Sequence, residues 1–446
     1  MQRLRGGPSL NHFILAAIHV LTSPDVIIFT LTYIGLALGT IPGTRLDRSS
    51  IAMLGAIAVL LFHRMNFSVA MGQIDFGTLA LLISLMVISA QLRLAGFYHF
   101  VVNKIISAAD RPWTLLLAVV GTAACLSALF ANDVICLIFA PVIVAAFKRA
   151  GRDPVPYLMA LATGANIGSA ATIIGNPQNM LIGESGQLSF AGYTLAVLPL
   201  ILASLILNVF GVALVYRRRI FHPTTISPSP TNNTALAMDD PPEAPDLPTP
   251  APTVQWPMVT KCLLIMALLL VAMIFGNYFF ISRPIAALAA AGLVLVSRKT
   301  SPRDLFTMVD WNLILLFVGL FIVIGNAQAH QLLQPAMRAL KAQGVNLQSR
   351  GPLAAVTLVL SNITSNVPAV LLLKPAIPLH ATSLWYLLAV VSTFAGNLTL
   401  LGSIANLIVA EQSARHSIRL SFTEYLKVGF PLALITTAMA VLYFRF

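Results

Sequence analysis

Four short polar stretches interrupt the apolar segments of this chain at points where membrane spans are expected. They consist of amides, hydroxyls, glycines and prolines rather than of catalytic acids and bases. A helix break at membrane depth leaves backbone N–H and C=O groups unpaired, so it persists only where it lines an enclosed or watered cavity. Half-helix N-termini offer N–H groups to an anion, and freed carbonyl and amide oxygens can hold a small cation. The chemistry indicated is therefore ligand binding within the membrane.

The candidate binding residues lie at two predicted hairpin tips and in two predicted broken spans. They are Asn132, Asp133, Thr172, Gly175, Asn176, Pro177, Asn179, Ser365, Asn366, Thr399, Gly402, Ser403 and Asn406. Amides donate and accept hydrogen bonds without carrying charge, so Asn132, Asn176, Asn366 and Asn406 are candidate Na⁺ ligands. The alternative is that the stretches are Gly and Pro kinks whose amides cap their own freed backbone groups. Four matched stretches favour a transport site.

Asp133 is a carboxylate inside an apolar segment, next to the first tip asparagine. Its counterpart in the second half is Val367, so the fold itself does not require a charge there. An ionised Asp133 could ligate Na⁺, and a protonated one could carry H⁺. Lys374, matched by Ala140, could attract an anion, pair with Asp133, or extend its charge to the membrane surface.

The two halves of the chain resemble each other. "TIIGNPQNMLIGE" aligns without a gap with "TLLGSIANLIVAE", so that Thr172, Gly175, Asn179 and Glu184 match Thr399, Gly402, Asn406 and Glu411 at one constant offset. Asn132 and Pro141 match Asn366 and Pro375 at a second constant offset, and Asp75 matches Asp310. Polar residues that recur at fixed spacing inside apolar segments predict an internal repeat. We expect the two matched glutamates to be interfacial or helix-end groups rather than ligands.

The repeats are predicted to insert in opposite orientations. The basic loop "FKRAGRDP" follows the first tip segment and the nearly neutral "PLHATS" follows the second, and basic loops stay in the cytoplasm. Segments 112–148 and 352–378 then enter and leave on one side as re-entrant hairpins. The loop 338–350, with Arg338, Lys341 and Arg350, opposes this arrangement.

Composition requires a membrane protein. The 446 residues are 58% hydrophobic and 9% charged, with a mean hydropathy of +0.86, whereas soluble domains carry about 25% charged residues. The net charge of +12 lies largely in short loops, which indicates topology rather than nucleic-acid binding. The lipid bilayer is thus the first predicted partner. The three cysteines have no metal-ligand spacing and are expected to be packing residues.

Four segments are predicted along the chain. Residues 1–45 form N-terminal membrane or interfacial helices, 46–220 the first transmembrane repeat, 221–257 a Pro-rich cytoplasmic linker, and 258–446 the second repeat. Arg217, Arg218 and Arg219 place the linker in the cytoplasm. The predicted fold is an all-α polytopic membrane protein with two inverted-topology repeats, each with a re-entrant hairpin and a broken helix, which is the layout of secondary transporters.

The motifs "NIGSAATIIGNPQN", "SNITSNVP" and "NLTLLGSIAN" resemble the ion transporter superfamily, which includes citrate permeases, arsenite efflux pumps and Na⁺/H⁺ antiporters. The resemblance implies an elevator-type transporter, often a homodimer, in the cytoplasmic membrane. It assigns substrate and ion binding to Asn132, Asn176, Asn179, Asn366, Ser403 and Asn406. The dicarboxylate branch has Ser-Asn-Thr at both tips, whereas the first tip here is Ala-Asn-Asp, closer to the arsenite and antiporter branches.

The predicted function is secondary active transport of a small anion, either a carboxylate or an inorganic oxyanion. No cofactor is expected, and because the sequence has no nucleotide-binding motif, the energy source should be an H⁺ or Na⁺ gradient. The alternatives are a Na⁺/H⁺ antiporter and an arsenite efflux permease, both with Asp133 as the coupling carboxylate. An intramembrane enzyme is disfavoured, because the sequence has neither a His-Glu-x-x-His nor a Gly-x-Ser-x-Gly motif.

Overall fold

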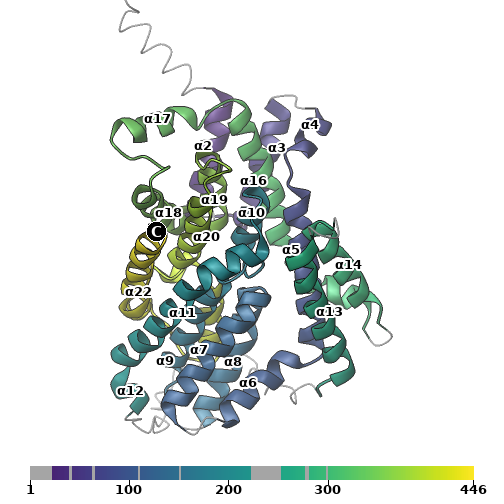
Figure 1. Ribbon diagram of the computed structural model, residues 1–446, viewed down its shortest axis with the longest axis vertical. Helices are drawn as coiled ribbons and strands as arrows, with labels where there is room; N and C mark the ends of the chain where they lie inside the picture. The colour runs from purple at the N-terminus through teal and green to yellow at the C-terminus, as the bar shows by residue number, and fades with distance from the viewer. Residues whose placement is uncertain are drawn as a thin grey trace, which may run out of the picture.

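The computed structural model describes residues 23–39, 43–62, 66–108, 111–149, 152–221, 253–276, 281–297 and 300–445, and these ranges contain helices and no strands (Figure 1). Six helices are long and apolar enough to cross a membrane: α5, α7, α11, α13, α16 and α22. The prediction of an all-α polytopic membrane protein is confirmed. The proposed N-terminal helix before residue 23 and most of the proposed linker, 222–252, lie outside the described residues.

The first half contains α2 (Pro24–Leu38), α3 (Arg48–Phe62), α4 (Phe67–Gly72), α5 (Phe76–Leu94), α6 (Phe97–Ala108), α7 (Pro112–Leu129), α8 (Asn132–Arg149), α9 (Val155–Ser169), α10 (Pro177–Ser185), α11 (Phe190–Val215) and α12 (Arg217–Phe221). The second contains α13 (Trp256–Phe275), α14 (Arg283–Leu295), α15 (Pro302–Phe306), α16 (Trp311–Ala329), α17 (Gln334–Ala342), α18 (Arg350–Thr364), α19 (Asn366–Leu373), the 3₁₀ turn η2 (Lys374–Ala376), α20 (Thr382–Ala395), η3 (Leu400–Gly402), α21 (Ile404–Arg415) and α22 (Phe422–Tyr443). Because α13 begins at Trp256, the predicted linker boundary at 257 lies inside this helix.

Corresponding helices begin in the same way. Asp75 caps α5 and Asp310 caps α16, with nearly the same backbone angles (φ −80°, ψ 85° and φ −76°, ψ 85°). Each carboxylate accepts a hydrogen bond from a first-turn backbone N–H, of Thr78 and Leu313 respectively, at 3.0 Å. The cap replaces a partner that these N–H groups lack inside the helix. The matched aspartates therefore have the same structural role in the two halves.

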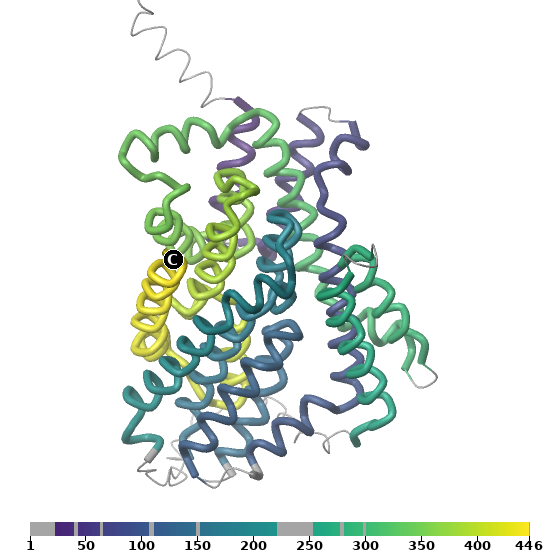
Figure 2. The backbone as a smooth tube through the Cα atoms, viewed as in Figure 1, coloured from purple at the N-terminus to yellow at the C-terminus, as the bar shows by residue number. Residues whose placement is uncertain are grey.

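The helices form two bundles that share segments of both halves. In the first, here called the α5/α16 bundle, α3 packs on α16 and α14 packs on α5. On the outside of this bundle α2 packs on α3, and α13 packs on α14. In the second, the α9/α20 bundle, α7 to α11 pack with α18 to α22. Figure 2 shows the yellow-green second-half helices beside the teal first-half helices. The two predicted repeats therefore interlock in space rather than forming separate bodies.

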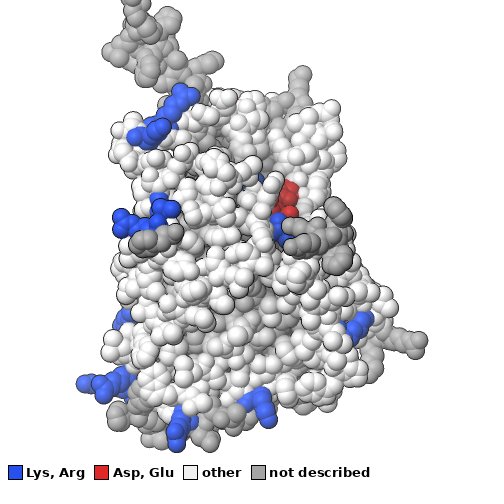
Figure 3. All heavy atoms as spheres, in the orientation of Figure 1, with Lys and Arg blue, Asp and Glu red and all other residues white. Residues whose placement is uncertain are grey.

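The outer surface suits a lipid environment. Large apolar side chains are exposed along the long helices, for example Leu214 at 77%, Leu264 at 65% and Leu268 at 61%. On the face shown in Figure 3 most of the surface carries no charge, and Lys and Arg appear as separate groups near the top, at mid-height and along the lower edge. α12 lies at the bottom of the view and α17 at the top (Figure 1). The cationic α17 thus lies at the end opposite Arg217, Arg218 and Arg219, as the inverted arrangement requires.

Candidate functional site

The first broken span lies between α9 and α10, where the backbone leaves the helix from Ala170 to Asn176. Pro177 opens α10, and Asn176 caps it by accepting a hydrogen bond from Asn179 N at 2.9 Å. Asn179 in turn donates to Thr172 O at 3.1 Å and to Tyr193 Oη at 3.2 Å. The polar residues of the break therefore pair the backbone groups that unwinding frees.

The second broken span repeats this arrangement between α20 and α21. Asn406 donates to Thr399 O at 3.2 Å, as Asn179 donates to Thr172 O, and also to Gly396 O at 2.7 Å. The Thr399 hydroxyl donates to Asn362 Oδ1 at 3.0 Å. The matched residues of the two halves thus have matched hydrogen bonds.

Each broken span is held by a helix of the other half. Asn166 of α9 donates to Asn406 Oδ1 at 3.0 Å and accepts from Ser403 Oγ at 3.0 Å. Thr393 of α20 occupies the position equivalent to Asn166 in the second half, and its hydroxyl oxygen accepts from Asn176 Nδ2 at 3.1 Å. Asn166 and Thr393 are each 2% exposed. These buried crossed bonds bring the two predicted breaks together at the centre of the α9/α20 bundle.

The two hairpin tips differ. Asn132, at the start of α8, is buried and donates to Asn166 Oδ1 at 3.1 Å, so the first tip joins the crossed network. At the second tip, Asn366 Oδ1 is buried without a hydrogen-bond partner. Ser365 next to it has φ 78° and ψ 161°, a backbone conformation that side-chain-bearing residues rarely adopt. Such local strain concentrates where backbone geometry serves binding.

The four candidate Na⁺ ligands do not all present a free oxygen. Asn176 Oδ1 accepts from Asn179 N, and Asn406 Oδ1 accepts from Asn166 Nδ2. Na⁺ ligation by all four asparagines would leave these two oxygens only their second lone pair for the ion. Among the described residues, no group of three or more His, Cys, Asp or Glu side chains is arranged to hold a metal ion.

Asp133 does not join the amide network but lines a cavity of about 160 Å³ between the two bundles. The walls are mainly apolar and come from α5, α8, α10, α21 and the segment 308–313. The ionisable groups in the wall are Asp133, Asp310 and Arg93. Within the described ranges Asp133 has no hydrogen bond or ion pair. Of the predicted site residues, Pro177 also lines this cavity.

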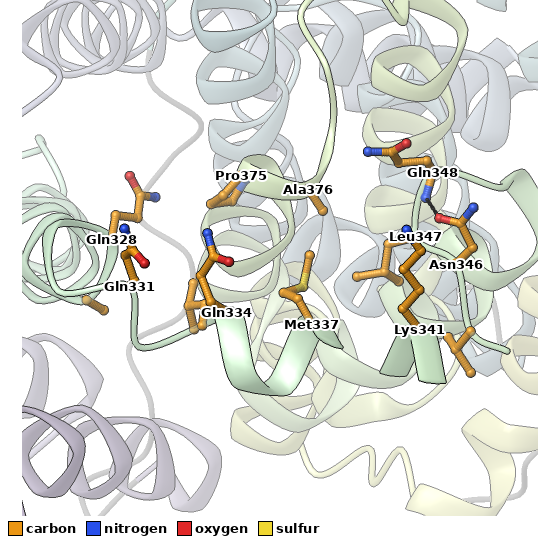
Figure 4. A pocket seen from close by; sticks show the side chains of 13 residues that line it. Gln328, Gln331, Gln334, Met337, Lys341, Asn346, Leu347, Gln348, Pro375 and Ala376 are labelled. Atoms are coloured by element: carbon orange, nitrogen blue, oxygen red, sulfur yellow. Dashed lines mark hydrogen bonds between the residues drawn. The ribbon is translucent and has the colours of Figure 1, made fainter. Parts of the chain in front are cut away.

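Lys374 lies elsewhere. It is partly buried in η2 and does not line the cavity with Asp133. A larger hollow of about 440 Å³ adjoins η2 at the end of the molecule where α17 lies. Figure 4 shows its amide side chains, which come from α16, the turn after it, α17 and the following loop: Gln328, Gln331, Gln334, Asn346 and Gln348. None of the predicted site residues lines it, so the smaller cavity is the candidate site.

Gly175 is expected to tolerate no side chain. A Cβ atom there would lie 2.2 Å from Ser169 O and 2.9 Å from Ser127 O, both backbone atoms that cannot move aside. We expect Gly175→Ala to prevent accumulation of folded protein, measured by size-exclusion chromatography in detergent. The control is Gly121→Ala in α7, where a Cβ meets no atom within 4 Å, and where the change should stabilise the helix by about 0.5–1 kcal/mol. A monodisperse Gly175→Ala protein would contradict the close packing.

Several residues of the network were not among the predicted ligands, including Asn166, Asn362, Thr393 and Asn397. Asn166 precedes its break and shows only as one more polar residue in an apolar helix. Thr393 shows no signal of its own, because buried threonines often bond within their own helix, as this one does to Ala389 O at 2.9 Å. Its position in the repeat could have identified it, because Thr393 is separated from Asn166 by the same number of residues as Thr399 is from Thr172. The ligand role of every predicted residue stays a prediction.

Comparison with known proteins supplies the family. A family model described as "Citrate transporter" matches residues 33–389. The chain belongs to the citrate transporter family. This agrees with the resemblance to the ion transporter superfamily, whose permeases include those for citrate.

Several relatives match nearly the whole chain. The silicon efflux transporter LSI3 of Oryza sativa is 27% identical over 456 residues, covering 90% of this chain and 93% of the relative. A 46 kDa membrane protein of Mycobacterium leprae is 27% identical, covering 94% and 97%. The putative transporter arsB of Dictyostelium discoideum is 23% identical, covering 89% and 87%. The crystal structure of the YdaH transporter of Alcanivorax borkumensis has the same fold, with a TM-score of 0.55 at 15% identity, covering 94% and 97%.

Proposed function

We propose that this member of the citrate transporter family is a secondary active transporter that couples movement of a small oxyacid to a proton gradient. The observation that carries the proposal is the place of Asp133. It is a carboxylate at a helix-hairpin tip with no partner among the described residues, and it lines a cavity between two helical bundles. An ionisable group inside a membrane bundle is costly to keep, and such groups mark proton and ion pathways.

The charge of the cavity wall limits which substrates can bind. Two carboxylates and one guanidinium give the wall a net charge of about −1 when all are ionised. A tricarboxylate would meet Asp133 and Asp310 with like charge, whereas a neutral or weakly acidic hydroxylated solute would not. A cavity of 160 Å³ suits a solute of a few heavy atoms. The names of two relatives, a silicon efflux transporter and the putative transporter arsB, agree with an oxyacid.

Proton coupling fits the cavity better than Na⁺ coupling. A proton needs one carboxylate, which Asp133 provides, whereas the candidate Na⁺ set has two of its four amide oxygens already bonded. In the proposed cycle, the α9/α20 bundle moves as an elevator against the α5/α16 bundle and exposes Asp133 to each side in turn. A homodimer in the cytoplasmic membrane, with substrate bound near the broken helices, completes the proposal.

Purified protein in proteoliposomes tests the function. Uptake of silicic acid, arsenite, citrate, succinate, sulfate and phosphate is measured under a pH gradient and, separately, a Na⁺ gradient. We expect a pH gradient to drive one of the first two, and the Na⁺ gradient to have no effect. Citrate uptake driven by Na⁺ would overturn both the substrate and the coupling ion. Exchange of Na⁺ for H⁺ without any solute would favour the antiporter.

A further inference from the structure

Arg283 joins the two bundles by one ion pair and two hydrogen bonds to backbone carbonyls. It opens α14 in the α5/α16 bundle, and its Nε lies 3.1 Å from Glu184 Oε1 in the last turn of α10, in the other bundle. Its two terminal nitrogens donate to Leu188 O at 2.7 Å and to Gly183 O at 3.2 Å. The two side chains are 19% and 20% exposed. A guanidinium at the carbonyl end of a helix also interacts favourably with the helix dipole.

The same two residue types recur at the equivalent positions of the other half. Arg48 opens α3 and matches Arg283, because the offset between them is the one that also relates Asp75 to Asp310. Glu411 lies on α21 and matches Glu184 in the alignment of the two broken spans. This second arginine and glutamate are, however, not paired with each other.

Neither residue has a strong partner among the described residues. Arg48 Nε is buried and has no hydrogen-bond partner in that part of the chain, which is a costly state for a charged group. Glu411 is 61% exposed and pairs with Arg415 one turn further along its own helix at 2.7 Å, and exposed pairs of that kind contribute little. Each therefore has unused bonding capacity.

Helix packing between the bundles also differs between the two halves, as the arginine–glutamate pairing does. α10 packs on α5 and α19 packs on α16. The equivalent partners by position would be α21 with α16 and α8 with α5. Instead, α21 packs on α8 and α9 within its own bundle. The 160 Å³ cavity lies where α5 faces Asp133 of α8 and Ile408 of α21. The contacts of α10 with α5 and of α19 with α16 are thus formed, whereas the equivalent contacts of α21 with α16 and of α8 with α5 are not formed to a comparable extent.

We propose that Arg283–Glu184 is one of two interchangeable latches, and that Arg48 and Glu411 form the second latch in the opposite transport state. The inference rests on the proposed function, since it needs the bundles to move against each other. Inverted repeats can exchange their contacts when such a molecule passes from one state to the other. Each latch then stabilises one state, and the cavity closes on one side as the second latch forms.

Crosslinking tests the latch in full-length protein in membrane vesicles. The parent protein is cysteine-free, with Cys125→Ser, Cys136→Ser and Cys262→Ser, so that only introduced cysteines can react. The test variant adds Arg48→Cys and Glu411→Cys to this parent. A short thiol-specific crosslinker should join this pair and stop transport. The matched control is Arg48→Cys with Glu424→Cys, because Glu424 is held by Arg219 and Lys427; it should remain unlinked.

Release of the first latch should favour the second. Adding Arg283→Gln to the Arg48→Cys, Glu411→Cys variant is expected to raise the crosslinking rate severalfold, and Glu184→Gln should do the same. Arg283→Lys keeps the charge and should raise it less. No crosslink in vesicles whose cysteine-free parent transports solute, or a rate unchanged by Arg283→Gln, would overturn the latch. A crosslink that forms in a parent without any transport would leave the latch standing and refute the proposed function instead.

Discussion

Replacement of Asp133 by asparagine is expected to reduce transport driven by a pH gradient to the level of empty liposomes. Asparagine keeps the size and the hydrogen-bonding capacity of the side chain but cannot bind or release a proton. Because Asp133 has no partner among the described residues, the substitution breaks no hydrogen bond or ion pair, and the protein should fold normally. The measurement is solute flux into proteoliposomes at a fixed pH difference, with protein amount checked by gel.

Two further measurements give this result its meaning. Exchange of labelled for unlabelled solute with no gradient should persist in Asp133→Asn, since exchange does not require the carboxylate to change protonation. Asp133→Glu should keep part of the driven flux. Asp304→Asn, an exposed aspartate on α15, is the control and should transport as the wild type does. Full pH-driven flux in Asp133→Asn would show that another group carries the proton, and Asp310 in the same cavity would be the next to replace.

The elements of this fold were largely predictable because their signals are local. Apolar runs gave the long helices, and the break predicted around Asn176 and Pro177 lies where α10 begins. The broken spans followed from Gly175 and Gly402, whose lack of a side chain lets other backbone atoms come close. α6 and α17 were not predicted, since short amphipathic helices lack a long apolar run.

The hydrogen-bond partners of the site residues were not predictable, because they depend on which helices of one half pack against the broken span of the other half. Sequence matching aligns Asn166 with Thr393 by position but does not show that each bonds to the break of the other half. Lys374 was expected to be able to pair with Asp133 because each is a charged residue whose counterpart in the other half is uncharged. In the structure Lys374 lies in η2, away from the cavity that Asp133 lines, because α19 packs toward α16 while α8 packs toward α21.

Asn166→Ala is expected to have the largest effect on the stability of the α9/α20 bundle. The Asn166 side chain bonds to Asn132, Asn397, Ser403 and Asn406, so its removal leaves several buried polar groups unpaired. An unsatisfied buried group costs about 1–3 kcal/mol, and two or more such losses in one network would lower the free energy of unfolding by roughly 2–5 kcal/mol if the groups find no new partners. We expect a lower thermal transition in detergent and no solute exchange.

The control for this loss is Ser84→Ala in α5. Ser84 is as deeply buried, but its hydroxyl has no hydrogen-bond partner, so its removal should leave the thermal transition nearly unchanged. Asn166→Gln adds one methylene to a packed position and should recover the transition only in part. If Asn166→Ala unfolds with the wild-type transition but loses exchange, the network binds substrate rather than holding the breaks together. Wild-type stability together with wild-type exchange would mean that the crossed bonds between the halves have neither role, and the breaks would then be ordinary kinks that cap their own backbone.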